Sequence, residues 1–162
     1  MSSYAKGLSV GFVILALIRA ENAKDRPHVA DAGREYAAVF SRAENPCAKE
    51  STTLGYEQCM GKEVEFTENH LNAFLAAVRG ILSDEDGEPG GTESAGKVKK
   101  LDLLNNADRA WRQYKKNLCE LGFAEFDGGS GASSAESECE YRVDRQYVEQ
   151  TADVILLKIL AK

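Results

Sequence analysis

Apolar residues spaced three and four apart recur in three long segments, and this spacing constrains the fold more than any other feature. The first segment, after Thr53 as the expected N-cap, carries Met60, Val64, Leu71, Phe74, Leu75, Val78 and Leu82. The second begins near Gly96 or Lys97, ends at Gly122, and carries Leu101, Leu104, Ala107, Trp111, Tyr114, Leu118 and Leu121. The third begins at Ser133 or Ser134 and continues through Cys139, Val143, Tyr147, Val154, Ile155, Leu157 and Ile159.

This spacing places the apolar residues of each segment on one face of an α-helix. No alternating pattern typical of a strand runs longer than four residues. The sequence therefore predicts an all-α fold, an antiparallel three-helix bundle spanning residues 47–162. We expect Leu71, Trp111, Tyr114 and Leu118 in its core.

The ends of this domain differ in composition from its helices. Residues 1–23 hold an uncharged run of eleven, Leu8 to Ile18, which is typical of a signal peptide and too short to span a bilayer. A buried helix and an uncleaved anchor are the alternatives. Residues 24–46 are polar apart from Tyr36 to Phe40, and the sequence leaves open a mobile arm or a short helix lying on the domain.

Four cysteines, Cys47, Cys59, Cys119 and Cys139, are all expected at one end of the bundle. In an exported chain this arrangement predicts two disulfides. Zinc is disfavoured because the spacings match no common zinc motif, and we expect no metal and no cofactor. Three pairings are possible. Matching the heights of the cysteines along the helices favours Cys59 with Cys139 and Cys47 with Cys119.

The charge balance argues against nucleic acid as a partner. The 26 acidic residues outnumber the 20 basic ones, giving a formal charge of −6, and phosphates would be repelled. His28 and His70 lie in no recognisable catalytic motif, and no phosphate-binding or dinucleotide glycine pattern is present. The sequence therefore predicts no enzymatic activity.

Acidic residues concentrate in one stretch that contains no base. Residues 117–141 hold six acids around a glycine-rich segment, 123–135, which we expect to be flexible. Charge of one sign speeds encounter with an oppositely charged partner. The sequence therefore predicts a surface for a cationic envelope or host protein, formed by Glu125, Asp127, Gly128, Gly129, Ser130, Glu136 and Glu138. The alternative is that these acids only keep a loop soluble.

Several of these residues also form a family pattern. Its second half reads Trp111-x-x-Tyr114-Lys115, Cys119, Gly128-Gly129-Ser130 and Cys139, then Arg142 and Arg145. Its first half reads Cys47-Ala-Lys-Glu-Ser-Thr52, Cys59 and Glu68-x-x-Leu71-Asn72. The chain resembles, over roughly 45–150, small bacterial envelope proteins similar to the N-terminal domain of the lysozyme inhibitor LprI. It departs from the pattern at Tyr147 and Thr151, where arginine and leucine are common.

The resemblance implies a helical, disulfide-bearing, exported domain. The leading hypothesis is a non-enzymatic periplasmic or secreted binding protein that inhibits lysozyme, with segment 124–135 occluding the cleft of a cationic lysozyme. The alternative is a structural or assembly module of the envelope that has no effect on lysozyme. Neither hypothesis requires a membrane span after removal of residues 1–23.

Overall fold

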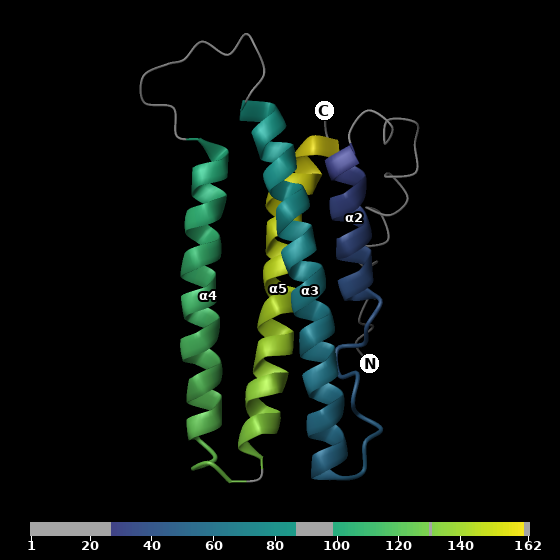
Figure 1. Ribbon diagram of the computed structural model, residues 1–162, viewed down its shortest axis with the longest axis vertical. Helices are drawn as coiled ribbons and strands as arrows, with labels where there is room; N and C mark the ends of the chain where they lie inside the picture. Colours follow the sequence, from purple (N-terminus) through teal and green to yellow (C-terminus); the bar gives the residue numbers. More distant parts are fainter. Residues whose placement is uncertain (1–26, 87–98, 130, 161–162) are drawn as a thin grey trace, which may run out of the picture.

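The computed structural model describes residues 27–86, 99–129 and 131–160, and every regular element in these ranges is an α-helix. They are α2 (Pro27–Phe40), α3 (Thr53–Asp86), α4 (Lys100–Ala124) and α5 (Ala132–Leu160). The helices run alternately down and up along one long axis (Figure 1). The all-α prediction is confirmed. The predicted signal peptide and the predicted start of the second helix lie outside the described residues.

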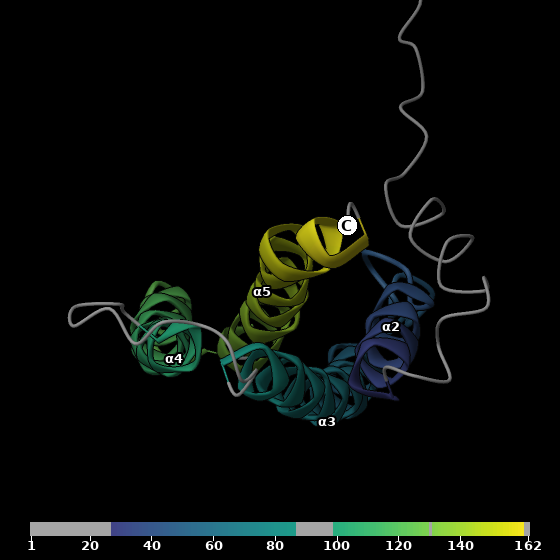
Figure 2. The same ribbon diagram turned by 90° about the horizontal axis from the view of Figure 1, so that it is seen from above.

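The prediction of three helices is wrong, because residues 27–40 form a fourth helix, α2, in the described part of the chain. This helix lies along α3 and also touches α5 (Figure 2). It buries Ala32, Tyr36 and Val39 against them. Glu35 accepts a hydrogen bond from His70 of α3 at 2.6 Å between Oε2 and Nδ1. Residues 27–40 are therefore an integral layer of the fold rather than a mobile arm.

The main core lies where α3 meets α5 and α2. The apolar stripe predicted for α3 points into it, with Leu71, Phe74, Leu75 and Val78 fully buried. Trp111 of α4 is 9% exposed and stacks on Tyr147 of α5, with 4.4 Å between the ring centroids. This stack fixes α4 against α5.

The core prediction is wrong for Tyr114 and Leu118, which are 55% and 36% exposed. Their helix, α4, lies at the edge of the bundle and contacts α5 and α3 from one side only (Figure 2). Its inward face instead carries a buried charge: Asp108 accepts hydrogen bonds from Arg79 Nη2 at 2.7 Å and from Arg112 Nε at 3.1 Å. Polar contacts thus join α4 to α3.

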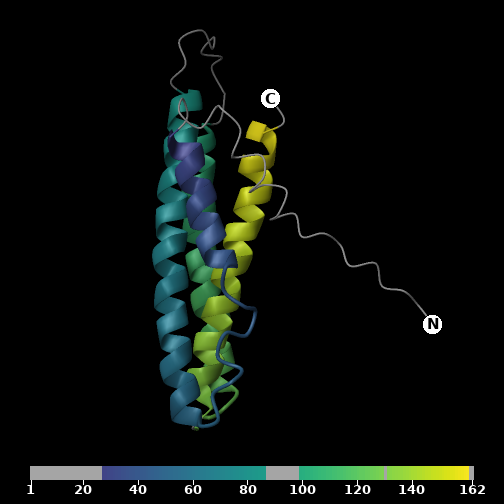
Figure 3. The ribbon, with the colours of Figure 1, turned by 90° about the vertical axis from the view of Figure 1, so that its right-hand side faces the viewer.

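The helix ends also differ slightly from the predictions. Thr52, rather than Thr53, caps α3, because its Oγ1 accepts a hydrogen bond from the Gly55 N–H at 3.0 Å. α4 continues beyond Gly122 to Ala124, and α5 begins at Ala132. Segment 41–52 runs down from α2 to the start of α3, at the same end of the molecule as the α4–α5 turn (Figure 3). In the described ranges, no helix is long and apolar enough to cross a membrane.

Candidate functional site

Two disulfides lie at the end of the bundle where α4 turns into α5, as expected, but the predicted pairing is wrong. Cys47 is bonded to Cys59, and Cys119 to Cys139. Cys119 lies five residues before the end of α4, and Cys139 seven residues after the start of α5. The antiparallel hairpin therefore brings these two to the same height, with 5.4 Å between their Cα atoms. The other bond fastens the segment before α3 to the second turn of that helix.

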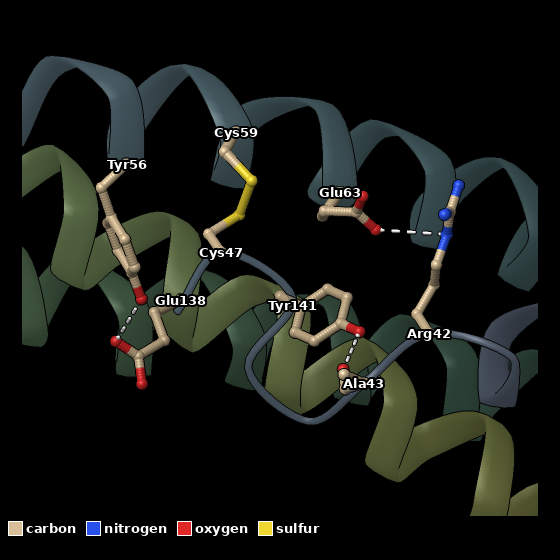
Figure 4. Close-up of a disulfide and its surroundings, with 8 residues drawn as sticks. All are labelled: Arg42, Ala43, Cys47, Tyr56, Cys59, Glu63, Glu138 and Tyr141. Carbon is tan, nitrogen blue, oxygen red and sulfur yellow. Dashed lines mark hydrogen bonds and ion pairs between the residues drawn. A yellow bond between two sulfur atoms is a disulfide. The ribbon is translucent and has the colours of Figure 1, made fainter. Parts of the chain in front are cut away.

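Hydrogen bonds around the Cys47–Cys59 bond join α3 and the segment before it to α5 (Figure 4). The Tyr56 hydroxyl of α3 donates to Glu138 Oε2 of α5 at 3.2 Å. The buried Tyr141 hydroxyl donates to the carbonyl oxygen of Ala43 at 2.6 Å. Nearby, Arg42 forms an ion pair with Glu63, at 3.4 Å. The connection between α2 and α3 is thereby held against α5.

The glycine-rich segment between the helices is shorter than the stretch 123–135 that the sequence predicted, because α4 continues to Ala124 and α5 begins at Ala132. Only residues 125–131 lie between α4 and α5. The Gly129 N–H donates to the Phe126 carbonyl at 2.7 Å, and the Ala132 N–H to the Gly129 carbonyl at 2.9 Å. Gly128 has φ +69°, in the left-handed region that glycine adopts without strain. The turn is therefore compact.

The structure brings the predicted binding residues to this one end, but not all of them are equally accessible. Those on the turn, Glu125, Asp127, Gly128 and Gly129, are exposed, whereas Glu136 and Glu138 in the first turns of α5 are half-buried. Glu138 is engaged by Tyr56. Ser130 lies outside the described residues. That these residues bind a partner remains a prediction.

Apolar side chains beside these acids were not identified from the sequence. Phe123 is 39% exposed and Phe126 is 51% exposed. The sequence already indicated such a surface, because both phenylalanines lie in an otherwise polar stretch that was expected to be a solvated loop. Large apolar side chains exposed together are typical of an interaction surface. We call this surface the acidic pole; its residues are Glu120, Phe123, Glu125, Phe126, Asp127 and Glu136.

A buried charge cluster lies inside the bundle, next to the acidic pole. Lys115 Nζ lies 3.1 Å from Asp144 Oδ1 and 3.9 Å from Glu68 Oε1. Burial raises the pKa of Asp144 to about 6, although Lys115 favours its ionised form. Burial also raises the pKa of Glu140, which Lys115 opposes and Glu136 reinforces. The Asp144 side chain is fully buried, so it lies within the packed interior and not on the surface that a partner would meet.

The two histidines serve helix packing rather than chemistry. His70 bonds Glu35 across the α2–α3 contact, and the His28 ring lies directly over the backbone of Gly80. Within the described ranges, no group of three or more histidine, cysteine or acidic side chains is arranged to hold a metal ion.

An apolar groove of about 530 Å³ lies at the other end of the molecule. Side chains of α3, α4 and α5 line it, among them Leu82, Leu103, Tyr147 and Val154. At its edge, Lys100 Nζ forms an ion pair with Glu85 Oε2 at 2.5 Å. The groove therefore offers apolar contact and little polar chemistry.

The comparisons with known proteins identify a family. The family described as lysozyme inhibitor LprI matches residues 43–150, about two thirds of the chain and all four cysteines. No curated protein and no solved structure gives a significant match. The matched range contains most of the segment before α3, both disulfides, the acidic pole and most of α5. The chain therefore belongs to the LprI lysozyme inhibitor family, and it is a non-enzymatic protein.

Proposed function

We propose that this protein is an exported inhibitor that binds a cationic lysozyme through the acidic pole. The observation that carries the proposal is the combination of exposed acids and exposed phenylalanines on one disulfide-bonded turn. Glu125 and Asp127 flank Phe126, and no lysine or arginine occurs between residues 117 and 141. Aromatic anchors surrounded by charge are common in protein interfaces.

The cross-links around the turn support a binding role. The Cys119–Cys139 bond joins the two helices on either side of the turn, and the hydrogen bonds of Gly129 and Ala132 constrain the described part of it. A preorganised surface loses less conformational entropy on binding than a flexible loop does. The compact turn thus suits binding better than the flexible loop that the sequence led us to expect.

The proposed mechanism is occlusion. Lysozymes cleave their substrate with two carboxyl groups that flank the scissile bond in a cleft. The turn would cover that cleft, with Phe126 against its wall and Glu125 and Asp127 against a basic rim. The backbone groups of Gly128 would supply hydrogen bonds, and we propose the same for Ser130. No residue of the inhibitor takes part in bond breaking.

Export agrees with the chemistry of the chain. Two disulfides account for all four cysteines, and such bonds persist in oxidising compartments outside the cytoplasm. We propose a periplasmic or secreted location, with residues 1–23 as the signal that directs the chain there.

The test is a muramidase assay with the oxidised protein. We expect inhibition at micromolar concentrations. Glu125→Gln/Asp127→Asn should weaken it by about tenfold at low salt, since each rim charge contributes up to roughly 1 kcal/mol, and should reduce its salt dependence. The matched control, Asp84→Asn/Asp153→Asn, removes two exposed charges far from the acidic pole and should inhibit like the unmodified protein.

A second arm tests the apolar contact. Phe126→Ala should weaken inhibition by a similar factor at low and at high salt, because burial of an aromatic ring is not screened by ions. Equal inhibition by all variants would place the binding surface elsewhere. Absence of inhibition at micromolar concentrations would instead favour an envelope interaction module, whose partner should co-purify from envelope extract.

A further inference from the structure

One face of α4 is exposed along nearly the whole helix and carries no charge. Its residues recur three and four apart, so they line a single stripe; they are Leu103, Asn106, Ala107, Ala110, Tyr114, Asn117, Leu118 and Leu121, and all are exposed. The large side chains Leu103, Tyr114 and Leu121 are 55%, 55% and 58% exposed. We call this stripe the outer α4 face.

Nothing in the described part of the chain covers this face. The inward face of α4 is the one that packs, through Leu104, Trp111 and Cys119, and Figure 2 shows α4 at the outside of the helix arrangement. From Leu103 to Leu121 the outer α4 face is about 27 Å long. Charged residues make up 28% of the chain, so their absence along this length favours contact with another apolar surface.

The order of large and small side chains fits a second copy of the same face. Two copies laid antiparallel about a two-fold axis near residue 112 bring Tyr114 opposite Ala110 and Leu118 opposite Asn106, so that each of these large side chains meets a smaller one. Leu121 meets Leu103 of the second copy at each end of the contact. A two-fold axis repeats each contact, as in most homodimers. In a parallel pair, Tyr114 would oppose Tyr114 and the alanines would leave gaps.

Charges at the two ends of the face specify the same orientation. Lys99 lies four residues before Leu103, and Glu125 four residues after Leu121; both are exposed and neither forms an ion pair with another described residue. The antiparallel register sets Lys99 of each copy against Glu125 of the other. A parallel register would set like charges together, which is repulsive.

We propose that the protein forms an antiparallel two-fold dimer through the outer α4 face. Packing of two helices along about 27 Å buries an area at the lower end of specific interfaces, so we expect a weak dimer. The dimer does not require the proposed lysozyme complex, and its test uses no lysozyme.

The experiment is sedimentation equilibrium of the disulfide-intact chain over a wide concentration range, without lysozyme. We expect a monomer–dimer equilibrium that Ala110→Arg abolishes. The matched control is Ala76→Arg, which places the same side chain at an exposed alanine of α3 and should leave the equilibrium unchanged. Circular dichroism verifies that each variant is folded. A chain that stays monomeric at millimolar concentration, or Ala110→Arg dimerising normally, overturns the proposal.

A charge exchange tests the register. Lys99→Glu and Glu125→Lys should each weaken the dimer by about three- to tenfold, because each change breaks two ion pairs and creates two repulsions. Combining both changes in one chain should restore the affinity to within about twofold of the unmodified value, by the logic of a double-mutant cycle. Single variants that dimerise as well as the unmodified chain would exclude the antiparallel register.

Discussion

Removal of the Cys119–Cys139 bond should lower the free energy of unfolding by about 3.3 kcal/mol, as the loop-closure entropy of the unfolded chain gives for a separation of 20 residues. The same relation gives about 2.8 kcal/mol for Cys47–Cys59, with a separation of 12. Alanine is the suitable replacement at positions 119 and 139, because both side chains are buried and serine would bury two hydroxyl groups.

The measurement is urea unfolding of Cys119→Ala/Cys139→Ala followed by circular dichroism, with a thiol titration in denaturant. The midpoint of thermal unfolding should fall by about 7 to 13 °C for a chain of this length. No free thiol should appear, since Cys47 and Cys59 remain bonded to each other. The control, Cys47→Ala/Cys119→Ala, breaks both bonds, exposes two thiols and should lose about 6 kcal/mol, comparable with the whole stability of many domains.

Two results would refute this reasoning. Two titratable thiols in Cys119→Ala/Cys139→Ala would show that the cysteines pair across the helices, as height matching had predicted. A loss below about 1 kcal/mol with no free thiol would show that the unfolded chain is already compact around this hairpin, so that the cross-link removes little entropy.

Two further predictions concern the packed interior. Because burial raises the pKa of Asp144 to about 6, the folded protein holds this proton more tightly than the unfolded chain; stability should therefore fall as the pH rises from about 4 to about 6, by at most roughly 3 kcal/mol. Urea unfolding at a series of pH values should show this decline, and Asp144→Asn should flatten it. Gly80→Ala would place a Cβ 2.6 Å from the His28 ring and should cost about 1 to 3 kcal/mol, measured by thermal unfolding. Adding His28→Ala should recover most of the loss, and equal destabilisation in the double variant would contradict the contact.

The sequence predicted that the cysteines gather at one end, but not which of them pair. The predicted pairing matched Cys59 with Cys139 because both lie near the start of parallel helices. It did not consider the antiparallel hairpin formed by α4 and α5. In an antiparallel hairpin, two residues at similar distances from the turn face each other, and Cys119 and Cys139 satisfy this condition. Loop-closure entropy also favours cysteines that are close in sequence. Both arguments were available before the structure.

Which face of α4 is buried was harder to predict, because this helix carries two apolar stripes. The spacing of three and four that joined Trp111, Tyr114 and Leu118 passes from the inward stripe to the outward one. The true inward face includes Asp108 and Lys115, whose burial is made possible by partners on α3 and α5. Hydropathy alone assigns charged residues to the surface. The inward face of α4 was therefore not recognised as a packing face.

The helix α2 escaped a firm prediction for a different reason. Its buried side includes Ala32 and Gly33 beside Tyr36 and Val39, which follow helical spacing. Small residues add little to an apolar stripe, although they allow two helices to approach closely. The contact of Gly80 with His28 shows this close approach. The pattern was therefore present but weak, and only the tertiary contact decides between arm and helix.

The two proposed surfaces meet at Glu125. In the dimer this carboxylate faces Lys99 of the second copy, whereas in the inhibitory complex it faces a basic rim, and one carboxylate cannot serve both contacts fully. Thermodynamic linkage then requires that each binding event weaken the other by the same factor. Ala110 lies far along α4 from the acidic pole, so its substitution removes the dimer without touching the lysozyme contact. If both proposals hold, that variant is the stronger inhibitor at concentrations where the unmodified chain dimerises, because Glu125 is then always free to meet lysozyme.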